Sequence, residues 1–128
     1  MRITLCGSTR FKTHFEEWNH KLAISGHTVY SLSLFAREES DKGKDGYLTI
    51  TDQEKITLDL VHLDKILNSD AIVVIDVGGY TGFSTKREIQ WARMQGKKVY
   101  WISPVPTPPD NWTPPDHWAG HLLNGAHR

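Results

Sequence analysis

The sequence has few of the features that define several large classes of protein. Its 128 residues include a single cysteine, so no internal disulfide can form, which is typical of a reducing compartment. No apolar run approaches the roughly 20 residues of a membrane span, and the first residues lack the apolar core of a signal peptide. Lys plus Arg and Asp plus Glu number 15 each, whereas proteins that bind nucleic-acid polymers or acidic membranes are usually basic. We therefore expect one small cytoplasmic domain whose partner is a small molecule.

Strand and helix patterns alternate along the first hundred residues. Strand patterns occur at 2–6, 27–32, 71–77 and 98–102. Helical patterns occur at 11–24, from 51 to about 68, and at 85–95. The continuous apolar run at 71–77 indicates burial on both faces of a parallel sheet. The alternation predicts an α/β fold, a flavodoxin-like or Rossmann-like three-layer sandwich with a central parallel sheet of four to five strands, in which 2–6 and 71–77 are neighbours.

The second helical segment opens with a capping-box pattern, Thr51 to Glu54. We expect its buried side to consist of Ile56, Leu60, Leu63 and Leu67.

Two segments fall outside the alternation. Residues 36–50 are charged and contain glycine, which predicts a functional lid or a disordered loop. The α/β domain is expected to span 1–103, followed by a tail at 104–128 that holds all six prolines and two of the five tryptophans. A short helix near 116–123 would either dock on the body or belong to a mobile tail.

Ligands of parallel α/β sheets bind beyond the carboxyl ends of the strands, which points first to the loop Gly7–Arg10. Glycine allows close approach of the backbone, Ser8 and Thr9 offer hydroxyls, and Arg10 adds a charge suited to a phosphate or carboxylate. The alternative is an ordinary turn in which Ser8 or Thr9 caps the next helix.

The glycine-rich loop after 71–77 leads to Glu88. Tyr80 in this loop could stack on a ring of a ligand. A carboxylate at the mouth of the cleft could attack an anomeric carbon. In the alternative, Thr85 and Glu88 form a capping box and Glu88 only caps its own helix.

The helix before the central strand carries Asp59 and His62, which could protonate a leaving base or hold the nucleophile. The alternative is a solvated helix face with a partly exposed histidine. Cys6 ends a buried strand and is expected to be a small core residue rather than a nucleophile. No convincing metal-ligand spacing is present among the other histidines, so we expect no metal and no cofactor.

Three motifs together resemble the nucleoside 2-deoxyribosyltransferase-like superfamily, over roughly residues 2–103. They are Leu-Cys-Gly-Ser-Thr-Arg-Phe at 5–11, Leu-Asn-Ser-Asp-Ala-Ile-Val-Val at 67–74, and Gly-Tyr-Thr-Gly-Phe-Ser-Thr-Lys-Arg-Glu-Ile-Gln-Trp-Ala at 79–92, followed by Gly-Lys-Lys-Val at 96–99. The chain looks most like small bacterial and bacteriophage relatives of the 2'-deoxynucleoside 5'-monophosphate N-glycosidases.

The resemblance implies a flavodoxin-like fold, a homodimer or higher assembly, and a double-displacement mechanism with Glu88 as nucleophile. His62 stands where the family commonly has an aspartate, and Ser84 matches a position near the phosphate. The expected catalytic residues are Glu88, His62 and Asp59. The expected substrate-binding residues are Cys6, Gly7, Ser8, Thr9, Arg10, Phe11, Phe35, Gly78, Gly79, Tyr80 and Ser84.

Three functions are compatible with this pattern. The first is hydrolysis of the base–sugar bond of a (deoxy)nucleoside 5'-monophosphate through a glycosyl–glutamate ester. The second is transfer of deoxyribose between bases. The third is a nucleotide-binding module without turnover.

Overall fold

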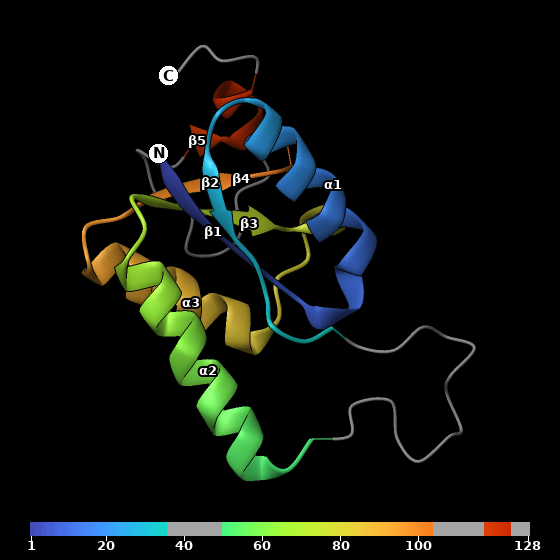
Figure 1. The fold of residues 1–128 in the computed structure, drawn as a ribbon, viewed down its shortest axis with the longest axis vertical. Helices are drawn as coiled ribbons and strands as arrows, with labels where there is room; N and C mark the ends of the chain where they lie inside the picture. The colour runs from blue at the N-terminus through green and yellow to red at the C-terminus, as the bar shows by residue number, and fades with distance from the viewer. Residues whose placement is uncertain (36–49, 104–116, 124–128) are drawn as a thin grey trace.

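The computed structural model describes residues 1–35, 50–103 and 117–123, and within these ranges the chain forms a five-stranded parallel sheet between helices (Figure 1). The expected lid at 36–50, apart from Ile50, and most of the tail lie outside the described residues. The strands are β1 Arg2–Gly7, β2 Thr28–Tyr30, β3 Ala71–Ile75, β4 Lys98–Trp101 and β5 His117–Trp118. The helices are α1 Lys12–Ile24, α2 Asp52–Leu67 and α3 Phe83–Met94.

The strand order, β2-β1-β3-β4-β5, is that of a flavodoxin-like sheet, with β1 and β3 adjacent as predicted. All residues of β3 are buried, which the unbroken apolar run at this position indicated. No helix among the described residues is long and apolar enough to cross a membrane.

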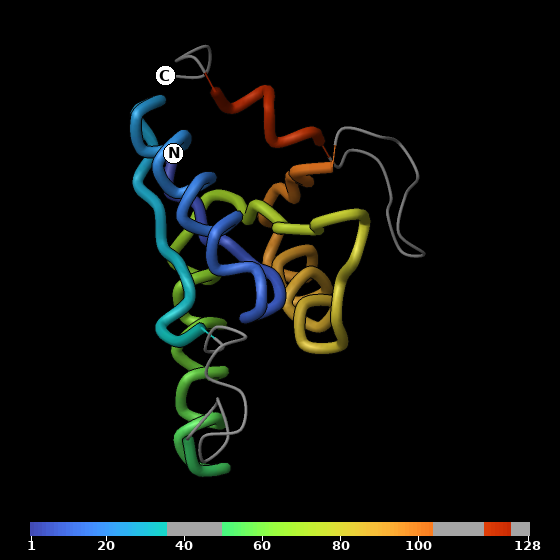
Figure 2. Tube along the Cα trace, turned by 90° about the vertical axis from the view of Figure 1, so that its right-hand side faces the viewer, coloured from blue at the N-terminus to red at the C-terminus, as the bar shows by residue number. Residues whose placement is uncertain are grey.

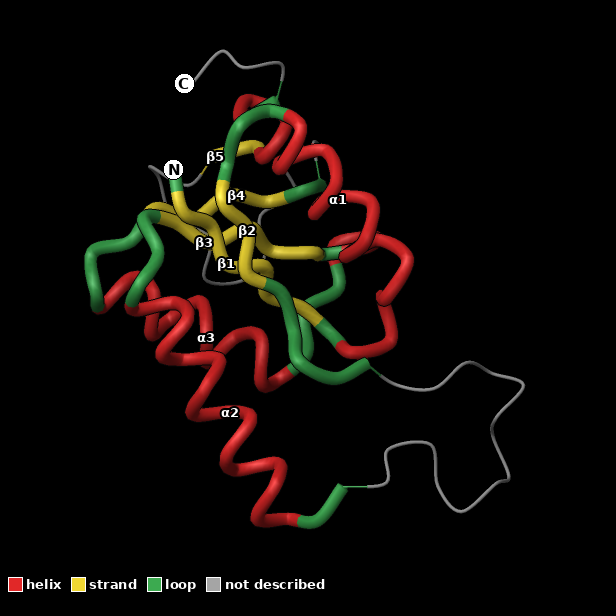
Figure 3. The backbone as a smooth tube through the Cα atoms, in the orientation of Figure 1, coloured by secondary structure: helices red, strands yellow, loops and turns green. Residues whose placement is uncertain are grey.

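Helices cover both faces of the sheet, with α1 on one side and α2 and α3 on the other (Figures 1 and 3). Side chains of a strand alternate between faces, so Ile3 and Leu5 of β1 pack toward α1. Cys6, one position further, packs on the opposite face with Ile66 of α2 and Ile89 of α3. This alternation places the cysteine between the two helices that carry the predicted catalytic residues.

Of the expected buried side of α2, only Leu63 packs against the core, where it is partly buried. Ile56, Leu60 and Leu67 are exposed, whereas His62 and Ile66 are buried. Ile66 packs into the apolar cluster of β3, β4 and α3, and this contact turns the His62 side of the helix inward. Packing on the sheet, and not the spacing of the apolar residues alone, therefore decided which side of α2 is buried.

The end of the described chain extends the sheet. β5 pairs with β4 in parallel, and a 3-10 turn at Ala119–Leu122 takes the place of the short helix expected near 116–123. Ala119 and Leu122 are fully buried against the α1 face. The Nε2 atom of His27 lies 2.8 Å from the carbonyl oxygen of Leu122, and its Nδ1 atom lies 3.0 Å from the amino terminus. The N-terminus and residues 117–123 therefore meet at one end of the molecule (Figure 2).

Candidate active site

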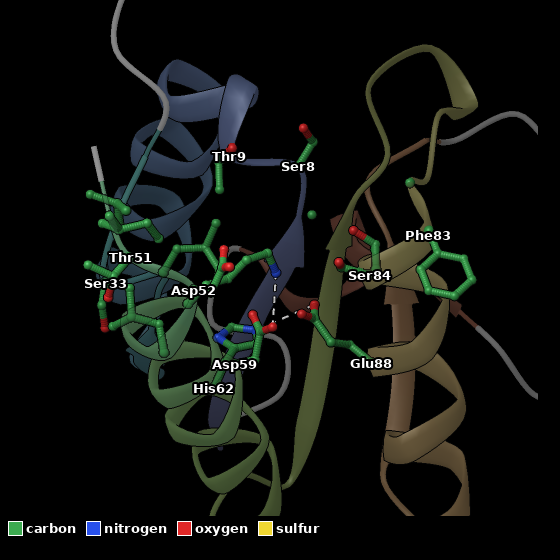
Figure 4. A pocket seen from close by; sticks show the side chains of 18 of the residues that line it. Ser8, Thr9, Ser33, Thr51, Asp52, Asp59, His62, Phe83, Ser84 and Glu88 are labelled. Atoms are coloured by element: carbon green, nitrogen blue, oxygen red, sulfur yellow. Dashed lines mark hydrogen bonds and ion pairs between the residues drawn. The ribbon is translucent and has the colours of Figure 1, made fainter. Parts of the chain in front are cut away.

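A pocket of about 460 Å³ opens where the loops after β1 and β3 meet α2, within the usual size range of small-ligand sites. Its walls come from Gly7–Thr9, from residues 32–34, from the side of α2 that carries Asp59 and His62, and from the start of α3. Asp59 and His62 on α2 and Glu88 on α3 point toward one another across it (Figure 4). The predicted residues that line the pocket are Gly7, Ser8, Thr9, Asp59, His62, Tyr80, Ser84 and Glu88.

Glu88 does not cap its own helix. α3 begins at Phe83 with Gly82 as its N-cap, two residues earlier than the sequence pattern indicated. Glu88 therefore lies in the second turn, where no free backbone amide of the first turn is within reach. The capping-box interpretation of Thr85 and Glu88 is wrong because the glycine turn, and not Thr85, starts the helix.

The Glu88 carboxyl group is poorly solvated. Its side chain is 15% exposed, and its Oε1 atom has no hydrogen-bond partner among the described residues. Burial, with a smaller contribution from the charge of Asp59, raises the pKa of Glu88 to about 7. The Cys6 thiol, Lys55 and Arg87 oppose this rise. At neutral pH the group is thus divided between its acid and carboxylate forms, as suits a group that gains and loses charge in a reaction.

His62 is a buried neutral imidazole and not part of a solvated helix face. Burial, followed by the positive charge of Lys65, lowers the pKa of His62 to about 4. Its Nε2 atom lies 3.6 Å from Glu88 Oε1, beyond hydrogen-bond length, and an uncharged ring forms no ion pair there. His62 can orient Glu88 or a ligand, but it holds no positive charge at neutral pH with which to act as a strong acid.

Cys6 lies behind the pocket, at the base of the His62–Glu88 pair. Its Sγ atom is 3.6 Å from His62 Nε2, and the side chain is fully buried. Burial, together with the neighbouring Glu88 carboxylate, raises the pKa of the Cys6 thiol well above its usual value. The protonated thiol lies within hydrogen-bond distance of His62 Nε2 and is a poor nucleophile.

Asp59 occupies the opposite wall and is paired with Lys55, one turn earlier on α2, at 2.9 Å. Lys55 lines the pocket and was not among the residues predicted from the sequence. The sequence contained the information needed to find it, because a lysine and an aspartate four residues apart on a helix face form an ion pair. The pair brings both charge signs to the pocket wall.

The loop after β1 both begins the next helical segment and lines the pocket. Ser8 accepts a hydrogen bond from the backbone amide of Arg10 and so caps the 3-10 turn Thr9–Phe11 that precedes α1. Arg10 itself lies outside the pocket lining, where its guanidinium donates to Ser8 at 3.2 Å and to the Tyr80 hydroxyl at 3.0 Å. A Cβ atom on Gly7 would lie 3.1 Å from Ile75, so glycine is needed there for packing on β3.

The first turn of α3 faces the pocket without a side-chain cap. Gly82, Ser84 and Thr85 line the pocket, and no side chain accepts a hydrogen bond at the N-cap. The first amides of a helix have no partner within the helix and attract anions. Ser84 adds a hydroxyl to the same wall.

Four further residues of the predicted substrate site lie outside the pocket lining. Phe11 contacts the Tyr80 ring edge to face, with centroids 6.0 Å apart. Phe35 packs on Phe15 of α1. Gly78 and Gly79 have φ angles of 63° and 82°, and their turn carries the chain into Tyr80.

No family model and no curated protein matches this sequence. Solved structures that share its fold include two enzymes. A 2-deoxyribosyltransferase from Bacillus psychrosaccharolyticus has a TM-score of 0.56 at 17% identity, over 82% of this chain and 75% of that one. The Clostridium botulinum CMP N-glycosidase BcmB has a TM-score of 0.52 at 20% identity, over 79% of this chain and 70% of that one.

Both structures belong to the superfamily that the motifs resemble, and both are enzymes. The comparison confirms the expected flavodoxin-like α/β fold. At these identities it establishes a shared fold, whereas a reaction is argued from the site itself.

Proposed function

We propose that this protein cleaves the N-glycosidic bond of a nucleoside 5'-monophosphate, with Glu88 as the nucleophile. The observation that carries this proposal is the Glu88 carboxyl group, which lies in the pocket with an Oε1 atom that no described residue engages. A carboxylate without a hydrogen bond on one oxygen, in a poorly solvated position, is available to attack an electrophilic carbon.

The reaction runs in two displacements. Glu88 attacks the anomeric carbon, and the C–N bond breaks with its electron pair passing to the base, which takes up a proton from solvent. Water then attacks the same carbon, loses a proton, and releases the sugar phosphate and the Glu88 carboxylate. His62 packs beside the carboxylate without a hydrogen bond to it, and Asp59 contacts the base from the opposite wall.

A 5'-phosphate fits the other end of the pocket. The uncapped first turn of α3 and the Ser84 hydroxyl offer donors there. Arg10 is held at the rim by Ser8 and Tyr80, from which its guanidinium can turn toward an anion. One of the proteins that share the fold is a CMP N-glycosidase, which supports a monophosphate substrate.

The test is release of free base, followed by chromatography, from matched pairs of nucleosides and their 5'-monophosphates. We expect release from monophosphates, and its loss in Glu88→Gln with the fold retained by circular dichroism. Glu16→Gln, an exposed glutamate on α1, is the matched control and should retain activity. Binding of monophosphates without release, unchanged in Glu88→Gln, would favour a nucleotide-binding module.

Deoxyribosyl transfer between bases is a second candidate, because another protein that shares the fold is a 2-deoxyribosyltransferase. Addition of a second free base distinguishes the two reactions. A transferase forms a new nucleoside and releases little free sugar, whereas a hydrolase forms sugar phosphate at the same rate with or without the added base.

The homodimer and the cytoplasmic location stay predictions.

A further inference from the structure

Three side chains with different metal-binding atoms converge at the base of the pocket. They are the Cys6 thiol from β1, the His62 imidazole from α2 and the Glu88 carboxylate from α3, and their ligand atoms all lie within 4.8 Å of one another. Spacing along the chain could not indicate this group, because the residues come from three separate elements. Sequence analysis accordingly predicted no metal.

Two of the three separations between ligand atoms are close to those of a tetrahedral zinc site, and the third is at most 4.8 Å. Zinc bonds of about 2.3 Å to sulfur and about 2.0–2.2 Å to nitrogen and oxygen place neighbouring ligand atoms roughly 3.4–3.5 Å apart. Cys6 Sγ and His62 Nε2 are 3.6 Å apart, and so are His62 Nε2 and Glu88 Oε1. The same imidazole nitrogen faces both other ligands, so an ion between them requires only small movements.

The ligand types also select the ion. Thiolate and imidazole favour Zn²⁺ and Co²⁺, while Mg²⁺ and Ca²⁺ prefer oxygen ligands alone. Three protein ligands leave a fourth coordination position. His62 and Glu88 line the pocket while Cys6 lies behind them, so that position faces the pocket, where water or a phosphate oxygen can occupy it.

We propose that Cys6, His62 and Glu88 bind Zn²⁺ and that the bound ion inhibits the enzyme by occupying its nucleophile. On binding, the thiol proton leaves to solvent and the thiolate bonds to the metal. The binding claim concerns this chain's residues alone, whereas the inhibition rests on the proposed function of Glu88.

The test begins with Co²⁺ as a spectroscopic probe, added to chelator-treated protein in a non-thiol reductant. Cys6 is the only cysteine in the sequence, so a sulfur-to-cobalt charge-transfer band can come from no other residue. We expect one equivalent of Co²⁺ to produce this band with the intense visible absorption of tetrahedral cobalt, and Zn²⁺ to abolish both. Wild-type protein that stays folded and develops no band with excess Co²⁺ overturns the proposal.

Variants then assign the ligands. Cys6→Ser should abolish the band. His62→Gln should weaken Zn²⁺ binding at least tenfold, measured by competition with a chelating dye. His20→Gln, at an exposed histidine on α1, is the control and should change neither the band nor the affinity for Zn²⁺. If His62→Gln and His20→Gln bind Zn²⁺ equally well, the assignment is wrong. Circular dichroism of each variant establishes that it is folded. If a variant unfolds, the melting temperature of wild-type protein is measured instead. We expect it to rise with Zn²⁺ but not with Mg²⁺, and the absence of that rise counts against the site.

Inhibition is measured separately. If base release occurs, Zn²⁺ should suppress it at the concentrations that fill the cobalt site, and a chelator should restore it. If metal-free, chelator-treated protein cleaves no nucleotide but develops the band when Co²⁺ is added, the metal site stands and the proposed reaction fails. If cleavage occurs and no band forms, the reaction stands and the metal site fails.

Discussion

The position of the Glu88 carboxyl group is unfavourable for stability. Its carboxyl group is withdrawn from water and given no hydrogen bond on Oε1, which costs folding energy whenever the group is charged. The same withdrawal keeps its pKa near neutral pH. A buried titratable group that folding alone does not require is typical of a functional site.

The first prediction concerns the stability of Glu88→Gln, measured by urea denaturation in the presence of a chelator. The folded chain holds the Glu88 proton up to about pH 7, and the unfolded chain releases it near the ordinary value of 4.5. Wild-type stability therefore falls as pH rises through this window. The amide does not titrate, so the variant should gain up to roughly 1–3 kcal/mol over wild type by pH 8. Its base release should fall by roughly a thousandfold or more. A stability difference that does not change between pH 4.5 and pH 8 would contradict the assigned environment.

The second prediction concerns Cys6, which acts as a positioning residue through Glu88. Its thiol stabilises the charged form of the carboxylate and so lowers the pKa of Glu88. In Cys6→Ala the acid limb of kcat/KM should move to higher pH, with little change in KM at the plateau. Cys6→Ser, whose hydroxyl can also donate, should partly restore the limb. Equal pH profiles in wild type and Cys6→Ala, with chelator present, would assign Cys6 to packing alone.

At the scale of elements, α2 and α3 act as the two walls that bring the catalytic groups together. α2 begins at a complete capping box, in which Thr51 accepts from the Glu54 amide and Glu54 accepts from the Thr51 amide. Its N-terminal part carries Lys55 and Asp59 beside the pocket. α3 begins at a glycine with no side-chain cap, which leaves its first amides available for a ligand.

The third prediction follows from this difference. Thr51→Ala removes one half of the capping box and should destabilise the protein by about 1 kcal/mol in urea denaturation. Thr57→Ala, on the same helix but within its interior, loses only a hydroxyl that bonds to the carbonyl oxygen of Gln53, and its effect should be within about 0.5 kcal/mol. Equal effects of the two substitutions would mean that the cap does not stabilise α2.

The fourth prediction concerns the anion site at the start of α3. Ser84→Ala and Arg10→Gln should each raise KM for a nucleoside 5'-monophosphate roughly tenfold and leave KM for the matching nucleoside unchanged. Lys21→Gln, at an exposed lysine of α1 outside the pocket lining, is the control for loss of a positive charge. An equal rise in KM for both substrates would place these residues at the sugar and not at the phosphate.

At the scale of the molecule, the two apolar clusters on either side of the sheet support different parts of the structure. The cluster under α2 and α3 contains Cys6 and supports the site. The cluster under α1 is closed by Leu122 and Ala119 from the end of the described chain. Stability and activity can therefore be altered separately from the two faces.

The fifth prediction tests this separation. Leu122→Ala should reduce the free energy of unfolding by about 2–4 kcal/mol, because a fully buried leucine leaves a cavity. Leu123→Ala, at a partly buried neighbour, should cost less. At a temperature where both variants are folded, their kcat/KM should equal that of wild type, because neither residue lies at the pocket. A lower kcat/KM in Leu122→Ala would show that the two faces are coupled.

Local patterns in the sequence determined the order of strands and helices, the parallel sheet and the neighbouring positions of β1 and β3. The physical reason is that alternation, periodicity and caps act over a few residues. Glu88, His62 and the loop after β1 could be identified for the same reason, since they lie in or near recognisable turns and motifs. The C-terminal strand was missed because its two residues form a strand only by pairing with β4.

Tertiary structure decided what those patterns left open. Which side of α2 is buried depends on the fit of Ile66 to the sheet, and that fit turned His62 inward and left Leu60 in solvent. The same rotation brought positions 6, 62 and 88 within 4.8 Å of one another. The separation of these residues along the chain does not indicate that their side chains come together in the fold. The fold alone therefore determined that Glu88 is buried beside a thiol and a neutral imidazole, and with it the acidity of Glu88 and the metal-binding group that we propose.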